Sequence, residues 1–217
     1  MKVAVEISGF MRGFHDCIHS WKNFMEPTHT YDFFISTYDI YGYNHMTHYD
    51  CDPNDKVDFD RVKEEIEEYG SLCELRTQMP SDEPRYKQMF NRIKEAHELC
   101  KSWNDDYSYI IRIRPDIFMS DKISLIVPEC DAAIFPERWG FCEDPTPESC
   151  RWQDEAQSVG LCDQMAVCGL EAMQTYSDIA KNPDLISIPE KSILDSFLNK
   201  KWSHQDFLQC VLSRNKK

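Results

Sequence analysis

Residues 109–118, YIIRIRPDIF, decide how the rest of this chain can be interpreted. The first five, 109–113, are mostly β-branched or aromatic, which predicts a strand. Arg112 and Arg114 share one face of that strand because side chains alternate along an extended chain. Asp116 follows directly, so an apolar strand delivers two arginines and an aspartate to its carboxyl end. Half-buried charges at such a position need partners.

Two apolar stretches nearer the N-terminus predict strands of the same kind. They are VAVEI at 3–7 and YDFFIS at 31–36. Turn and polar residues follow each of them: Ser8, Gly9, Thr37, Tyr38 and Asp39. Further strands are expected over 71–76, 132–135 and 163–169.

Helical spacing of apolar residues predicts the segments between the strands. The expected helices cover 15–25, 58–69, 84–103, 171–181, 190–200 and 204–213. The clearest is 84–103, in which one buried stripe is formed by Met89, Ile93, Ala96, Cys100 and Trp103. Gln88 and Arg92 lie on another face of that helix. Residues 137–160 are rich in acids and in proline or glycine, and we expect a long loop there.

Strands and helices alternate over the first two thirds of the chain. This pattern predicts an α/β fold with a mostly parallel central sheet and helices on both faces. We expect one domain over residues 1–217, either as the whole protein or as one domain of a longer one. Ligands of such sheets sit beyond the carboxyl ends of the strands.

Composition excludes several classes of function. Hydrophobic residues make up 41% of the 217 residues, which fits a globular protein, and the net charge of −14 disfavours a nucleic-acid binder. The start of the chain does not resemble a signal peptide, and no apolar run is long enough to span a membrane. We therefore expect a soluble, cytoplasmic protein without membrane contact. The 10 cysteines are then expected to be reduced thiols.

Three local patterns could carry chemistry, and each has a plain structural alternative. Asp116 beside its arginines could hold a cation while the arginines bind phosphates, or could simply close the strand with a salt bridge. The turn ending in Arg12 could bind an anion through backbone amides, or could be an ordinary tight turn. Asp163 could be a general base, or a cap or turn residue.

Other metal-like patterns are weaker. His15 and His19 have the i, i+4 spacing of zinc-protease histidines, but Asp16 stands where that motif needs glutamate. The acidic stretch from Asp50 starts like a calcium loop, then lacks its glycine and its bidentate glutamate. His204 could complete a metal site or could be a surface histidine.

Taken in order, the pieces resemble a known family. The segments SGFMR, FISTYD, IIRIRPDIF, CDQMAVCG and IPEKSIL together span residues 8–194. They are similar to small glycosyltransferases of the GT-A fold, and among these to the capsid-glycosylating enzymes of large algal DNA viruses of the chlorovirus type. The resemblance implies a GT-A-like sheet, and the host cytoplasm as location if the chain is viral.

The resemblance implies a role for each matching residue. Ser8, Gly9 and Arg12 would sit by the donor nucleotide, and Thr37, Tyr38 and Asp39 would line the pocket of its base and ribose. Asp116 would hold Mn²⁺ or Mg²⁺ on the donor pyrophosphate. Beyond the resemblance, we expect Gln88, Arg92, Arg112 and Arg114 to bind the donor and His204 to be a further metal ligand. Asp163 would face the acceptor and the anomeric carbon. The first acid of the family's D-x-D motif is Arg114 here, which leaves fewer metal ligands.

The implied reaction is transfer of a hexose or deoxyhexose from a nucleoside-diphosphate sugar, with a UDP-sugar favoured, to a glycan or glycoprotein acceptor. Negative charge grows on the departing diphosphate, and a divalent cation or arginines would stabilise it. Two alternatives stay open. One is a nucleotide-sugar-binding module without catalysis. The other is a metal-dependent hydrolase or nucleotidyltransferase, which would need a second carboxylate beside Asp116.

Overall fold

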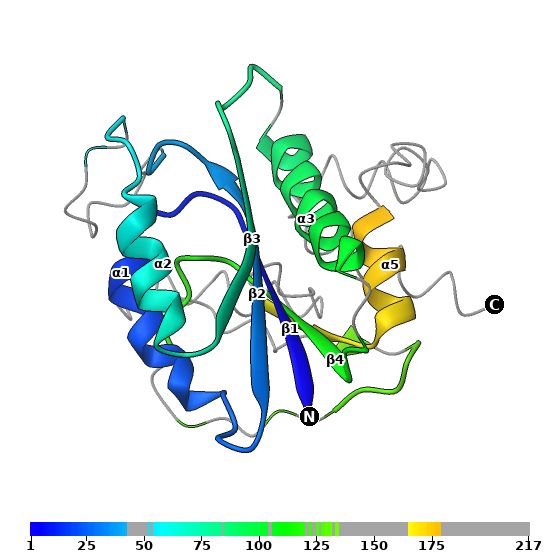
Figure 1. Cartoon of the computed structure of the whole chain (residues 1–217). Helices are drawn as coiled ribbons and strands as arrows, with labels where there is room; N and C mark the ends of the chain where they lie inside the picture. The colour runs from blue at the N-terminus through cyan, green and yellow to red at the C-terminus, as the bar shows by residue number, and fades with distance from the viewer. Residues whose placement is uncertain are drawn as a thin grey trace, which may run out of the picture. The chain divides into compact units, whose positions relative to one another are not determined.

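The described residues form one six-stranded sheet, which is the centre of the fold (Figure 1). We describe it from a computed structural model. The structure describes residues 1–42, 52, 54–83, 85–103, 106–119, 122, 125, 127–131, 133–134 and 165–178. The strands are β1 (Lys2–Ser8), β2 (Thr30–Tyr38), β3 (Ser71–Gln78), β4 (Tyr109–Ile113), β5 (Ala133–Ile134) and β6 (Met165–Cys168). The helices are α1 (Phe14–Cys17), the 3₁₀ helix η1 (Ile18–Asn23), α2 (Phe59–Glu67), α3 (Arg85–Ser102) and α5 (Leu170–Asp178).

The strand order is β3-β2-β1-β4-β6-β5. β1 pairs in parallel with both β2 and β4, and β2 pairs in parallel with β3. β6 is antiparallel to both of its neighbours, β4 and β5. The predicted α/β class with a mostly parallel sheet is therefore confirmed.

Helices cover both faces of the sheet, as predicted. Figure 1 shows α1 and α2 on one face and α3 and α5 on the other. The first face is apolar: Val5 and Ile7 of β1 pack in the main hydrophobic cluster with Phe14 and Trp21. Alternation turns the intervening β1 residues toward α3, because successive side chains of a strand point to opposite faces.

The face toward α3 is partly polar although it is buried. His97 of α3 lies with its Nδ1 2.9 Å from Oε1 of the fully buried Glu6. The hydroxyl of Tyr107 donates to Asp32 of β2 over 2.9 Å. Buried polar groups are costly unless they are hydrogen-bonded, so these pairs fix how α3 and the chain after it pack on the sheet.

Two details of the predicted helices were wrong. The expected helix over 15–25 is a short α-helix followed by η1. The Trp21 indole of η1 donates to the carbonyl of Ile117 over 2.8 Å and ties this segment to the chain after β4. In α3 the predicted stripe of buried residues is wrong at its C-terminal end. Trp103 follows the last helical residue and is exposed, whereas Phe90 is buried.

All described residues belong to one compact unit, made of residues 1–134 and 164–180. The predicted loop over 137–160 and the predicted helices over 190–200 and 204–213 lie outside the described residues. Within the part of the chain that is described, no helix has the length and apolar character needed to cross a membrane.

Cysteines in the described ranges are free thiols, as expected: Cys17, Cys73, Cys100, Cys130 and Cys168. Burial, with smaller contributions from Asp116 and Asp16, raises the pKa of Cys17 to about 12. A raised thiol pKa means that little thiolate forms near neutral pH, and the thiolate is the reactive form. We expect Cys17 to resist iodoacetamide at pH 8 in the native protein, whereas the exposed Cys130 is alkylated. Peptide mapping by mass spectrometry distinguishes the two, and equal labelling would contradict the buried position of Cys17.

The centre of the sheet gives a direct test of the fold. Ile111 of β4 is fully buried, and Leu170 at the start of α5 is exposed. We expect Ile111→Ala to lower the free energy of unfolding by about 3 kcal/mol, because it leaves a cavity in the core. The control Leu170→Ala is expected to change it by less than about 0.5 kcal/mol. Urea unfolding measures both, and similar losses in the two variants would refute this core.

Candidate functional site

The strand order places a topological switch point between β1 and β4. From β1 the chain proceeds to β2 and β3 on one side, then crosses over to β4 on the other side. At such a switch point the connections after the two adjacent strands diverge, which leaves a space where ligands of open α/β sheets bind. The residues that follow β1 and β4 are therefore the first candidates for a site.

The turn after β1 is held in place by β2. The amide of Gly9 donates to the Ser36 carbonyl over 3.2 Å, and the Thr37 hydroxyl donates to the Gly9 carbonyl over 2.7 Å. Gly9 has φ of 127°, a conformation that side-chain-bearing residues rarely adopt. Thr37 is fully buried and supports this turn, and its predicted contact with a donor stays a prediction.

Arg12, Arg114 and Asp116 meet at the switch point. Arg114 binds the Asp116 carboxylate with two donors, Nε to Oδ1 over 2.9 Å and an η nitrogen to Oδ2 over 2.6 Å. Nε of Arg12 donates to the same Oδ2 over 3.2 Å. The carboxylate thus joins the turn after β1 to the end of β4. We call these three residues the arginine–aspartate cluster.

The exposure of the cluster suits an anion-binding site. The side chain of Asp116 is 8% exposed, whereas those of Arg12 and Arg114 are 27% and 24% exposed. The carboxylate holds the two guanidinium groups beside each other while part of each faces solvent. Guanidinium groups bind phosphate with paired, charge-assisted hydrogen bonds. A pair that is oriented in advance loses little side-chain entropy when the anion binds.

The cluster by itself does not fit a divalent metal ion. Both carboxylate oxygens of Asp116 accept from guanidinium groups, and a dication there would lie beside two positive charges. In the described ranges no three histidine, cysteine or carboxylate side chains gather as metal ligands. His204 and Asp163 lie outside those ranges. The salt-bridge alternative for Asp116 is thus what the structure shows, and the predicted metal site remains a prediction.

Arg112 and Ser8 form a buried support beneath the cluster. Nε of Arg112 donates to the Ser8 hydroxyl over 3.1 Å, and both side chains are buried. The sequence placed both residues at the donor nucleotide. In this structure their hydrogen bond joins the ends of β4 and β1, and their predicted contact with a donor stays a prediction.

Tyr38, at the end of β2, is packed between two neighbours. Its ring stacks on Phe10 with centroids 4.1 Å apart, and the Arg92 guanidinium carbon lies 5.5 Å from the ring centroid. Burial raises the pKa of the Tyr38 hydroxyl. The ring of Tyr38 therefore contacts protein groups in this structure, and its predicted place beside the donor base stays a prediction.

Asp39 and Gln88 make contacts within the protein that the sequence did not predict. Asp39 pairs with the Lys56 ammonium on the loop before α2. Gln88 donates to the carbonyls of Ser81 and Glu83, over 2.8 and 2.6 Å, and so ties the loop after β3 to α3. Gln88 is therefore a structural residue of that loop in this structure.

A cavity beside α3 was missed by sequence reasoning. It has a volume of about 330 Å³ and lies between the end of β3 and one side of α3. Its lining residues are Gln78, Met79, Ser81, Glu83, Asn91, Arg92, Lys94, Glu95 and Glu98. The available signal was the polar residue at every third or fourth position of α3 from Asn91 onward, but such a pattern is also typical of a solvated helix face.

The two N-terminal histidines do not form a metal pair. Nδ1 of His15 lies 2.7 Å from Glu65, and its Nε2 lies 3.1 Å from the Tyr41 hydroxyl. His19 instead has its Nδ1 3.3 Å from the hydroxyl of Tyr69. The i, i+4 spacing therefore serves two separate contacts that hold α1 and the loop after β2 against α2.

Comparison with known proteins does not identify a family. The chain matches no protein-family model, and its sequence matches no curated protein. The functional conclusion therefore depends on the chemistry of the site.

The arginine–aspartate cluster predicts a measurable loss of stability when its centre is changed. We expect Asp116→Asn to lower the free energy of unfolding by about 1–3 kcal/mol, because two guanidinium groups lose a charged partner that is largely buried. The control is Glu67→Gln on α2, where the carboxylate is 51% exposed and lies 3.8 Å from Lys63. Urea unfolding of both variants measures the difference. No loss at Asp116 beyond that of the control would show that the cluster does not join β1 and β4.

Proposed function

We propose that this protein is a glycosyltransferase that takes a sugar from a nucleoside-diphosphate sugar. The observation that carries the proposal is the arginine–aspartate cluster at the switch point of the sheet, where Arg12 and Arg114 are held side by side with part of each exposed. A diphosphate is the ligand group that two adjacent guanidiniums suit best. The sheet order is compatible with the GT-A-like fold that the sequence resemblance implies.

The cluster would act on the leaving group. When the bond between the sugar and the diphosphate breaks, negative charge grows on the diphosphate oxygens. Arg12 and Arg114 would bind those oxygens and stabilise the charge, and because Asp116 already orients both, little reorganisation would be needed. The stabilisation is greater in the transition state than in the ground state, which is what accelerates a reaction.

The acceptor side of the reaction would depend on residues near the start of β6. Met165, the first residue of β6, pairs with Ile113, so β6 begins at the edge of the sheet where β4 ends. Asp163 precedes Met165 by two residues in the sequence. A carboxylate there would accept the proton of a glycan or glycoprotein hydroxyl, which is the role the resemblance implies. Mn²⁺ or Mg²⁺ would have to find ligands besides Asp116.

A second candidate is a nucleotide-sugar-binding module without catalysis. It is favoured because both carboxylate oxygens of Asp116 already accept from guanidinium groups. The described part of the cluster could bind an anion through its arginines, but it offers a metal ion no carboxylate oxygen without a guanidinium partner. Such a module would bind the donor and never release the nucleoside diphosphate. The two candidates therefore differ in turnover and not in donor binding.

Binding and turnover of a panel of nucleotide sugars test both candidates. We expect one donor to bind and its nucleoside diphosphate to be released in the presence of a suitable acceptor. Arg12→Ala and Arg114→Ala should each weaken binding at least about 10-fold, because each removes a charge-assisted hydrogen bond worth about 1.5–3 kcal/mol. Calorimetry measures binding, and a coupled assay for the released diphosphate measures turnover, with and without Mn²⁺.

The matched control is Arg61→Ala, which removes a guanidinium from the exposed face of α2. It should leave binding unchanged. Donor binding without release under every metal and acceptor would favour the binding module. Absence of binding for every nucleotide sugar would remove both candidates.

A further inference from the structure

We propose that the cavity between β3 and α3 is the base pocket of the donor site and that it selects guanine. This inference rests on the proposed function, since it names the nucleotide of the proposed donor as a GDP-sugar. It differs from the sequence resemblance, which favours uridine. Three observations carry it: the cavity, a buried arginine with an unused donor and a carboxylate that α3 holds by a hydrogen bond.

Arg92 gives the cavity a fixed cation. Its side chain is only 5% exposed although it lines the cavity. Glu95 accepts from the Arg92 guanidinium and from the Ser36 hydroxyl, which holds the arginine against the end of β2. Nε of Arg92 is buried and has no hydrogen-bond partner among the described residues. A buried donor without a partner is costly, and a ligand that accepts from it would remove that cost.

Glu83 gives the cavity a carboxylate at a defined position. Asn91 of α3 donates to Oε2 of Glu83 over 3.2 Å. Gln88 also donates to the Glu83 carbonyl, so both the backbone and the side chain of Glu83 are tied to α3. Glu83 and Arg92 both line the cavity. One carboxylate oxygen, Oε1, remains for a ligand.

The carboxylates of the cavity do not share a cation. Glu83, Glu95 and Glu98 all line it, but they do not form a group of three ligands that a metal ion could bridge. Lys94 pairs with Glu98 over 3.7 Å at the other end. Glu95 and Glu98 are thus engaged with cations of the protein, and Glu83 is the carboxylate of the cavity that is positioned to accept from the N–H donors of a ligand.

Guanine matches this combination better than the other bases. On one edge it has two acceptors, N7 and O6, which are the usual partners of an arginine. On the adjacent edge it has two donors, N1–H and the 2-amino group, which a carboxylate accepts. Uracil offers a single donor between two carbonyl oxygens, and a carboxylate repels those oxygens. Adenine and cytosine each offer one amino group beside a ring acceptor.

The spacing of the strands connects the cavity to the phosphate site. The cavity lies at the end of β3, and the arginine–aspartate cluster lies at the ends of β1 and β4. Only β2 separates β3 from β1 in the sheet, so these two strands are about 10 Å apart at ~4.8 Å for each strand spacing. The cavity lies between the end of β3 and α3, so a nucleoside diphosphate with its phosphates at Arg12 and Arg114 would extend across the end of β2 to place its base there.

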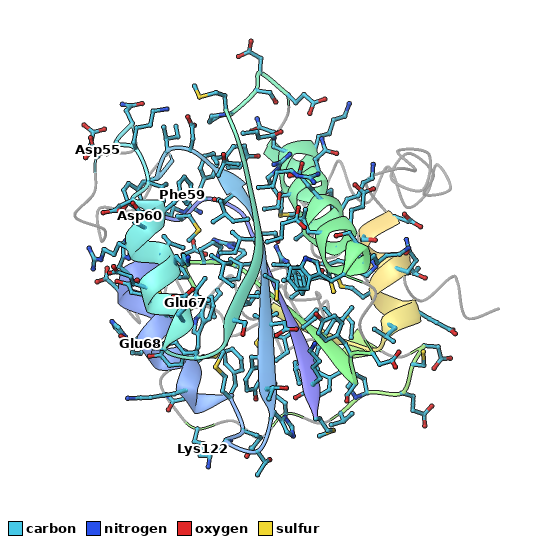
Figure 2. All side chains as sticks on the ribbon, in the orientation of Figure 1. Asp55, Phe59, Asp60, Glu67, Glu68 and Lys122 are labelled. Atoms are coloured by element: carbon cyan, nitrogen blue, oxygen red, sulfur yellow. The ribbon has the colours of Figure 1, made fainter. Side chains whose placement is uncertain are left out.

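Binding of free nucleoside diphosphates to the whole chain tests the inference. We expect GDP to bind at least about 10-fold more tightly than UDP, ADP or CDP in calorimetric titrations. Glu83→Gln should abolish most of that preference, because an amide replaces one acceptor oxygen with a donor that opposes the donors of guanine. UDP binding should not change. Glu67→Gln on α2, which Figure 2 shows on the opposite side of the sheet from α3, is the matched control and should bind GDP as the unchanged protein does.

Each outcome decides between the inference and the function it rests on. UDP binding as tightly as GDP would overturn the guanine pocket and leave the glycosyltransferase proposal in place. A GDP preference that Glu83→Gln does not reduce would overturn the assignment to this cavity. Failure of every nucleoside diphosphate to bind would sink the proposed function as well. Circular dichroism of Glu83→Gln establishes that the variant is folded, and Asn91→Ala, which releases the Glu83 side chain, should weaken GDP binding in the same direction.

Discussion

The two ion pairs that Asp116 makes with Arg12 and Arg114 are the constraint on which the rest of the site depends. Two guanidinium groups side by side repel each other, and a single carboxylate, largely buried, keeps them together. It does so across the point where the sheet changes direction, so it also joins the turn after β1 to the end of β4. Gly9, Ser8 and the strand pairs around them position this contact. The same interaction therefore joins two strands and orients the two guanidinium groups on which the proposed function depends.

The sheet edge is organised as two sites with different chemistry. At β1 and β4 the side chains are cationic and suit phosphate oxygens. Near β3 and α3 the cavity combines Arg92 with carboxylates, and these suit a base with both acceptors and donors. Tyr38 lies between them, stacked on Phe10 and covered by Arg92. A donor lying along this edge would have its charged part recognised by one set of protein side chains and its uncharged part by another.

Much of the fold could be predicted from local patterns. Residues 109–113 form β4 with the predicted bounds, because a short apolar run ended by charges and proline has few alternatives. What failed depends on contacts between distant residues. Trp21 of the 3₁₀ helix η1 reaches Ile117, and the buried Arg92 is stabilised by Glu95 and Tyr38. At the site, the sequence offered the salt bridge of Asp116 with its neighbouring arginine as one alternative, but it did not bring Arg12 to the same carboxylate. The burial of Ser8, Thr37 and Arg112 could not be predicted locally either, because it depends on the packing of whole strands. No local pattern encodes the cavity, which requires β3 and α3 together.

The two faces of the sheet should tolerate sequence change differently. On the side of α1 and α2 the packing is apolar, and swaps among aliphatic side chains of similar volume usually cost little there. On the side of α3, the pairs of Glu6 with His97 and of Tyr107 with Asp32 are directional, so losing one partner leaves the other unsatisfied in the interior. Each of these pairs can therefore be replaced without an unsatisfied partner only when both residues change together. Over evolutionary time, residues on the side of α1 and α2 can change one at a time, whereas the polar pairs on the side of α3 must change as pairs.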